Sequence, residues 1–106
     1  MPLIDTATLA VTERLPGWRG RIFNSANMTF AHYEFDAGSR IHEHRHEQEE
    51  VWNVVEGELE VSIAGEVRKA GPGQVAIVPP NTPHAVRALT DGRAIVVDHP
   101  LRWDMG

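Results

Sequence analysis

The stretch GSRIHEHRHEQEEVWNVVEG, residues 38–57, carries the pattern that decides how this chain folds. Side chains alternate across a β-strand, so a strand through His44 and His46 directs both imidazoles to the same face. Glu50 lies in a valine-rich segment that we expect to form the next strand of the same sheet, and His84 follows near the end of the chain. Three imidazole nitrogens and one carboxylate oxygen suit a divalent transition metal. The spacing therefore predicts a metal site.

The composition narrows the possible functions. The chain has 106 residues, a formal net charge of −5 and no cysteine. This length predicts one domain, residues 1–106, and the acidic balance argues against a nucleic-acid-binding protein. The absence of cysteine excludes disulfides and thiol catalysis. The first residues, Met1–Asp5, lack a basic region followed by an apolar one, so we do not expect a secretory signal, and no apolar run approaches the roughly 20 residues that span a bilayer. We expect a cytoplasmic protein that does not bind membranes.

Turn residues divide the chain at intervals typical of an all-β sandwich or barrel. Residues 3–14 have loose helical spacing with Asp5 as an N-cap, although a strand or an irregular arm fits almost as well. Pro16 and Gly17 then interrupt the chain. We expect an N-terminal arm (1–17), a closed or double-sheet barrel (18–99) and a C-terminal tail (100–106). The expected strands are 21–23, 28–35, 41–46, 51–55, 59–63, 66–69, 75–78, 84–89 and 94–98.

Two motifs make the chain resemble a known family. Residues 38–57 match G-x5-H-x-H-x3-E-x6-G without a gap. The second motif is partial, because Asn81 stands where the family often has Gly, and Ala88 replaces a terminal Asn. On these residues the chain resembles a small single-domain cupin, which implies a double-stranded β-helix, or jelly-roll, barrel. The resemblance implies four metal ligands: His44, His46, Glu50 and His84.

Within the cupins, the chain is most similar to small pectin-degradation proteins that linearise unsaturated uronates. This likeness rests on residues 46–50, 78–84 and 100–104. In that group the fourth ligand is typically Gln, whereas this chain has Glu50. Arg102 aligns with an arginine that is thought to act in catalysis there. The group's catalytic acid falls on Val96, so Asp98, two residues later with the same parity, is the substitute.

Five residues are candidates for the pocket or the chemistry beside the metal. His42 and Arg40 share the parity of His44, so His42 is expected in the pocket and Arg40 at its mouth, where it would hold an anion. The alternatives for His42 are an extra metal ligand and a hydrogen-bonded wall residue, and the alternative for Arg40 is a surface salt bridge. Trp52 is in phase with Glu50 and forms either a pocket wall or part of the core. Asp98 is an inward carboxylate, and Asp98 or His42 is the candidate for moving a proton, while the tail residue Arg102, like Arg40, is a candidate for holding a substrate carboxylate.

Three functions fit this set of residues. The first is an isomerase or lyase that uses Fe, Mn, Ni, Cu or Zn as a Lewis acid on a small carboxylate-bearing substrate. The second is an Fe(II)-dependent dioxygenase, and the third is a non-catalytic sensor of a small ligand. A closed structural zinc site is the alternative to any open metal site. We also expect a homodimer, formed by the outward side chains of Val51 and Val55 with Val61 or Ile63.

Overall fold

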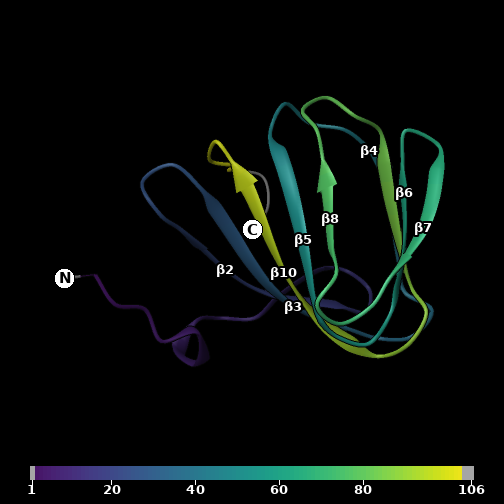
Figure 1. Cartoon of the computed structure of the whole chain (residues 1–106). Helices are drawn as coiled ribbons and strands as arrows, with labels where there is room; N and C mark the ends of the chain where they lie inside the picture. The colour runs from purple at the N-terminus through teal and green to yellow at the C-terminus, as the bar shows by residue number, and fades with distance from the viewer. Residues whose placement is uncertain (1, 104–106) are drawn as a thin grey trace.

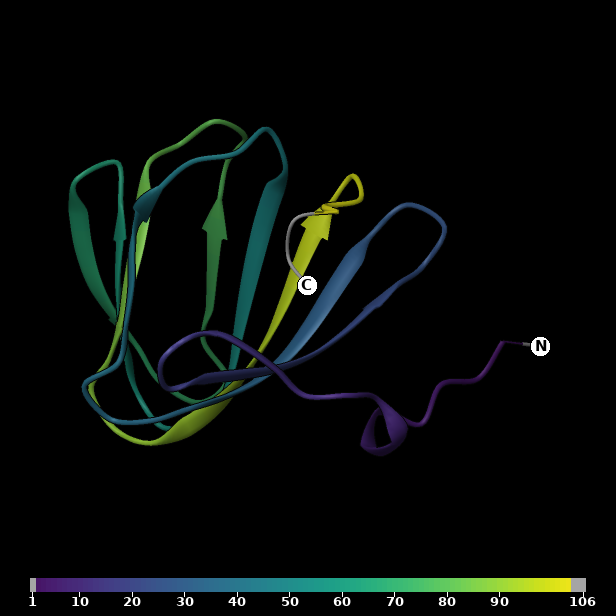
Figure 2. The same cartoon turned by 180° about the vertical axis from the view of Figure 1, so that it is seen from behind.

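Two antiparallel β-sheets face each other in the computed structural model, which describes residues 2–103 (Figures 1 and 2). The larger sheet has the strand order β1-β2-β3-β10-β5-β8, and the smaller has the order β4-β9-β6-β7. Both figures show the N-terminal arm extending away from the sheets. The elements are η1 (Thr6–Thr8), β1 (Thr12–Leu15), β2 (Trp18–Asn24), β3 (Thr29–Phe35), β4 (Arg40–His44), β5 (Glu49–Glu56), β6 (Leu59–Ile63), β7 (Glu66–Ala70), β8 (Val75–Val78), β9 (His84–Ala88) and β10 (Gly92–His99).

The core lies between the sheets because each strand turns alternate side chains inward. On β5, Trp52 and Val54 are buried, while Asn53 between them is more exposed. Trp52 pairs with Val96 of β10, which in turn pairs with Ala31 of β3, so small and large side chains alternate across the sheet. Burying one large apolar side chain contributes about 1.5–3 kcal/mol. The buried apolar side chains are Trp18, Ala31, Phe35, Trp52, Val54, Leu59, Val61, Ala70, Val78, Val86, Ala88, Ala94 and Val96.

The expected all-β jelly-roll fold is confirmed, and the strands start or end within about three residues of the expected positions. The helix considered for residues 3–14 does not form. Asp5 does cap a turn, accepting a hydrogen bond from the backbone nitrogen of Ala7 at 3.0 Å, but that turn spans only Thr6–Thr8. Residues 12–15 of the expected arm instead form β1, which pairs with β2. No helix in the described part of the chain is long and apolar enough to cross a membrane. Residues 104–106 of the expected tail lie outside the described residues.

Two expectations about strand placement are wrong. Glu50 is not on the same sheet as His44, because residues 45–48 cross from β4 in the smaller sheet to β5 in the larger one. The metal-site candidates therefore face each other across the interior. Val61 and Ile63 are not outward residues either, since Val61 is buried in the core and Ile63 packs against it.

Gly57 forms the turn between β5 and β6 with a φ of 79°, in the left-handed region. A Cβ at this position would lie 2.3 Å from the carbonyl oxygen of Asp91. The substitution Gly57→Ala is therefore expected to lower the free energy of unfolding by more than about 2 kcal/mol, as measured by urea denaturation. Gly65 has a similar φ of 81° with no atom within 4 Å, so Gly65→Ala should cost only about 1 kcal/mol. Equal losses in the two variants would contradict the steric explanation.

Candidate metal site

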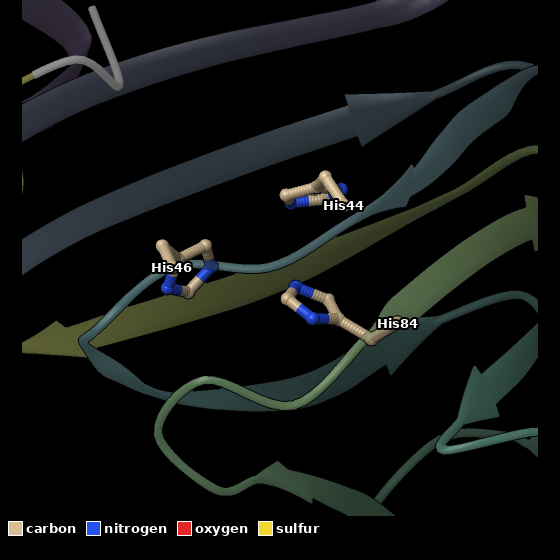
Figure 3. Close-up of side chains that lie close together, drawn as sticks. All are labelled: His44, His46 and His84. Atoms are coloured by element: carbon tan, nitrogen blue, oxygen red, sulfur yellow. The ribbon is translucent and has the colours of Figure 1, made fainter.

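Three imidazoles lie close together at the end of β4, the start of β9 and the segment that leads to β5. His44 ends β4 and is the cross-strand partner of His84, the first residue of β9, while His46 follows in the bend that leads to β5. The ring centroids of His44 and His84 are 4.3 Å apart, and those of His46 and His84 are 5.0 Å apart. One ring nitrogen from each residue lies within 4.8 Å of the others. Figure 3 shows the three rings grouped in this way. The geometry suits a shared metal ion.

The backbone sets the orientation of all three rings. Each Nδ1 lies within hydrogen-bonding distance of a carbonyl oxygen, and because a carbonyl only accepts, Nδ1 carries the hydrogen. Each Nε2 is then the ring atom left to bind a metal, as in metal-binding histidines. The Nε2 atoms of His46 and His84 are buried and have no hydrogen-bond partner, which is costly unless another group satisfies them. The Nδ1–oxygen distances are 2.8 Å from His44 to His42, 3.1 Å from His46 to Gln48 and 2.8 Å from His84 to Thr82.

Glu50 adds a buried carboxylate from the opposite sheet. Its oxygens lie 3.4 Å from Nε2 of His46 and 3.1 Å from Nε2 of His84. Trp52 donates its indole hydrogen to Oε2 at 2.7 Å, and Arg102 donates to Oε1 at 3.2 Å. Burial acts to raise the pKa of Glu50, but the contacts with His46, His84, Asp98 and Trp52 outweigh it and hold this pKa well below its ordinary value. Glu50 is therefore an ionised carboxylate in a fixed orientation.

Asp98 lies beside Glu50 and is completely buried. Neither of its oxygens makes a hydrogen bond, although Nη1 of Arg102 is 3.6 Å from Oδ2. Burial, and next the negative charge of Glu50, raise the pKa of Asp98 to about 8. Asp98, Glu50 and His46 form a second group of potential ligands that overlaps the three histidines. The inward orientation expected for Asp98 is confirmed, but its side chain does not line the pocket. Its role as a general base stays a prediction.

A pocket of about 400 Å³ leads to the imidazoles. Trp18, Tyr33 and Trp52 form an aromatic wall, and the ring centroids of Trp18 and Trp52 are 5.8 Å apart. Trp52 is thus both a core residue and a pocket wall. His42 lines the pocket as expected, from an exposed position at its rim. The pocket has an apolar side and a polar base, which suits a small organic substrate.

Of the arginines expected at the pocket, Arg102 lines it and Arg40 does not. Arg40 is exposed, pairs across the strands with Arg87 and does not line the pocket. Arg14 and Arg45 line it instead, together with Arg102. Strict alternation places Arg45 on the outer side, but β4 ends at His44 and the alternation no longer applies beyond it. Arg14 was not expected because β1 was not recognised as a strand.

Comparison with known proteins shows that others share this architecture. A family model described as "Cupin domain" matches residues 31–100, more than half of the chain. KdgF from Halomonas sp., a pectin-degradation cupin, is similar with a TM-score of 0.91 at 28% identity, covering 100% of this chain and 99% of that one. An RmlC-like cupin from Shewanella frigidimarina has a TM-score of 0.92 at 23% identity, with coverages of 100% and 96%.

A more distant neighbour is oxalate decarboxylase from Bacillus subtilis, a protein with Mn(II) centres. Its TM-score is 0.82 at 18% identity, and the match covers 92% of this chain but 29% of that one, so it supports the fold alone. No curated protein matches the chain significantly. The family match, the full-length likeness to KdgF and the histidine and glutamate cluster all agree with the two sequence motifs. The chain belongs to the cupin family.

Proposed function

We propose that this protein is a metal-dependent enzyme that acts on a small carboxylate-bearing substrate. The observation that carries the proposal is the convergence of three correctly oriented imidazoles at the base of a pocket that also holds arginines. A purely structural zinc site would be closed on all sides. Here His44, His46 and Glu50 line the pocket, so a substrate has access to the proposed metal ligands.

His44, His46, His84 and Glu50 are the residues that would hold a divalent metal. Their three nitrogens and one oxygen suit Fe, Mn, Ni, Cu or Zn. The bound ion would supply Lewis acidity toward a carbonyl or hydroxyl oxygen of the substrate. The donor set fits such an ion because two of the buried Nε2 atoms have no hydrogen-bond partner. Arg102 and Trp52 keep the Glu50 carboxylate in one orientation, which preorganises the site.

Arg45 is the residue that we expect to bind the carboxylate of the substrate. This side chain lines the pocket and has no acidic partner among residues 2–103. A guanidinium binds a carboxylate through two parallel hydrogen bonds, which fixes both position and orientation. Arg102 is less suited to this role because Glu50 and Asp98 already hold it. The likeness to KdgF supports a uronate-like acid and an isomerase or lyase reaction. His42, at the exposed rim, is the candidate for exchanging a proton with solvent.

The metal and the reaction class can be tested together. Protein purified without oxygen should contain about one equivalent of a transition metal per chain by elemental analysis. A panel of unsaturated uronates and small hydroxy and keto acids is then followed by NMR and by an oxygen electrode. Conversion of a uronate without oxygen uptake would support the proposal. Oxygen uptake would indicate a dioxygenase instead, while absence of metal, or binding without turnover, would contradict the enzyme proposed here.

The arginine assignment predicts a specific kinetic change. Replacing Arg45 with methionine should raise KM for the converted acid by about 10-fold or more and leave kcat within about a factor of two, because the lost contact is made equally in the ground and transition states. Arg40→Met is the matched control, since Arg40 is exposed outside the pocket, and it should leave both constants unchanged. Equal effects of the two substitutions would refute the role of Arg45.

A further inference from the structure

Five polar side chains are buried in the part of the chain that the structure describes, and they fall into two groups. Three belong to the proposed metal site or lie beside it. The other two, Thr29 and Gln48, do not line the pocket. Burying a polar group is costly unless it is hydrogen-bonded, so the partners of these two side chains indicate their role. The five buried polar residues are Thr29, Gln48, Glu50, His84 and Asp98.

Thr29 and Gln48 both bind the backbone of the segment that follows β10, where the chain curls back (Figure 2). Gln48 donates a hydrogen bond from Nε2 to the carbonyl oxygen of Leu101 at 3.1 Å. Oγ1 of Thr29 accepts a hydrogen bond from the backbone nitrogen of Arg102 at 2.9 Å, and it donates its own hydrogen to Oδ1 of Asn24 at 2.7 Å. Residues 100–103, the C-terminal strap, are thus held at two consecutive positions by side chains from different parts of the fold.

The C-terminal strap contacts a row of buried polar residues at one end of the larger sheet. Thr29 of β3 pairs with Asp98 of β10, and Asp98 pairs with Glu50 of β5. Arg102 contacts all three members of this row. Its backbone nitrogen binds Thr29, while its Nη1 lies 3.6 Å from Oδ2 of Asp98 and 3.2 Å from Oε1 of Glu50. The backbone of Arg102 is therefore anchored at one end of the row and its guanidinium at the other.

Gln48 also connects the C-terminal strap to one of the metal-site histidines. Its backbone carbonyl accepts a hydrogen bond from Nδ1 of His46 at 3.1 Å, while its side chain holds Leu101. The connection thus runs from His46 through Gln48 and the strap to Arg102, which contacts Glu50. Oε1 of Glu50 lies 3.4 Å from Nε2 of His46, so the ring of contacts closes at the site.

We propose that Gln48 and Thr29 are positioning residues that dock the C-terminal strap and thereby place Arg102 against Glu50. Neither side chain lines the pocket, so both act on the site through Arg102. A long arginine side chain loses much rotamer freedom when it is held in one geometry, and anchoring its backbone from two sides limits the positions that it samples. Groups behind a metal ligand orient that ligand, and their loss typically lowers metal affinity by about 10–100-fold.

The indole of Trp52 reports the position of Glu50 without any metal. It donates a hydrogen bond to Oε2 of Glu50 at 2.7 Å, whereas the buried indole nitrogen of Trp18 makes no hydrogen bond and Trp103 is 79% exposed. The chain has three tryptophans, so a nitrogen–proton NMR spectrum of the metal-free protein should show three indole signals, and Trp52→Phe identifies the relevant one. Arg102→Met should shift this signal, because the guanidinium no longer holds the carboxylate.

Two variants loosen the C-terminal strap without touching Arg102 itself. Thr29→Val removes the hydroxyl and keeps the shape of the side chain, while Gln48→Leu removes the amide. Each should shift the Trp52 signal in the same direction as Arg102→Met does. Each should also speed hydrogen exchange of the Arg102 amide about 10-fold, as expected when one hydrogen bond that holds the strap is lost. Thr29→Ser keeps the hydroxyl and should restore both values.

Thr90 and Gln74 provide matched controls in the turns that precede β10 and β8. Oγ1 of Thr90 also accepts a hydrogen bond from a backbone nitrogen, that of Glu58 at 3.0 Å. Oε1 of Gln74 accepts one from the backbone nitrogen of Gly71 at 2.7 Å. Thr90→Val and Gln74→Leu should therefore leave both the Trp52 signal and the exchange of the Arg102 amide unchanged.

A zinc titration then relates the C-terminal strap to the metal. Thr29→Val should weaken zinc binding about 10-fold, and Thr90→Val should not. The proposal would be overturned by a Trp52 signal that stays in place in Thr29→Val and Gln48→Leu, by wild-type exchange of the Arg102 amide, or by wild-type zinc affinity in Thr29→Val. The NMR measurements need no metal. A wild type that binds no zinc would therefore refute the proposed metal site, and the NMR signals would still decide the role of the strap.

Discussion

Replacing His84 with alanine is expected to lower the metal affinity of this protein at least about 100-fold. Removing a group behind a metal ligand already costs 10–100-fold, so losing a ligand itself should cost at least as much. His84 is only 1% exposed and its Nε2 faces both His46 and Glu50, so water cannot easily replace it. The measurement is a competition titration against a chromophoric chelator, followed by elemental analysis after dialysis.

Thermal melting gives a second readout of the same variant. A metal at 100 times its dissociation constant stabilises the folded state by about 2.7 kcal/mol, so metal should raise the melting temperature of the wild type by several degrees. It should not do so for His84→Ala. The control is His99→Ala, because His99 is an exposed residue at the end of β10, and this variant should bind metal like the wild type. One equivalent of tightly bound metal in His84→Ala would refute the site.

The sequence predicts the fold well because the same local rules apply to most of its strands. Turn residues mark the strand ends, and alternation correctly places Trp52 and Asp98 inward. It also brings His44 to the pocket, whereas His46 lies beyond the end of β4 and reaches the pocket from the segment that crosses between the sheets. Asn81, where the family often has glycine, has a φ of 57°, which asparagine tolerates better than most residues. These features depend on a few neighbouring residues, so sequence alone reveals them.

The errors occur where the chain leaves regular strand geometry. Glu50 was expected on the sheet of His44 because it lies on the next strand along the chain, but the bend at residues 45–48 carries the chain to the facing sheet. The same bend turns Arg45 into the pocket, and parity counted through it gives the wrong face. Arg14 was missed for a different reason, since β1 has only four residues and a weak pattern. Sheet changes and short edge strands depend on tertiary packing, which a local pattern does not contain.

The three basic groups around Glu50 explain why its carboxylate is both buried and ionised. His46, His84 and Arg102 surround it, and Trp52 supplies a further hydrogen bond. Arg102 is also the only cation within salt-bridge distance of Asp98 among the described residues. Glu50 and Asp98 thus share one guanidinium, and removing it leaves Glu50 with only the imidazoles and Trp52, and Asp98 with no cation within salt-bridge distance among the described residues. Arg102 therefore stabilises the folded site even when no substrate is bound.

Replacing Arg102 with methionine is accordingly expected to lower the free energy of unfolding of chelator-treated protein by about 3–5 kcal/mol, the range found when one partner of a buried ion pair is removed. Arg102 acts to lower the pKa of Asp98, so the variant should raise that pKa further above its value of about 8. A carboxyl whose pKa is raised by folding contributes stability that is fully present below the unfolded pKa and is lost as pH rises toward the folded pKa. The loss in Arg102→Met should therefore be larger at pH 8 than at pH 5, as urea denaturation at both values would measure.

Two further variants separate this electrostatic cause from a simple loss of packing. Arg87→Met removes an arginine whose ion pair with Glu60 at 3.1 Å is partly exposed, and it should cost less than about 1 kcal/mol. Combining Arg102→Met with Asp98→Asn should recover part of the lost stability, since the neutral amide no longer needs a cation. The recovery should be greatest at pH 8, where Asp98 is ionised in the unfolded chain but is held protonated in the folded variant, a difference that the amide removes. If the double variant is no more stable than Arg102→Met at that pH, the two residues are not coupled through charge, and Arg102 supports the site only by filling space.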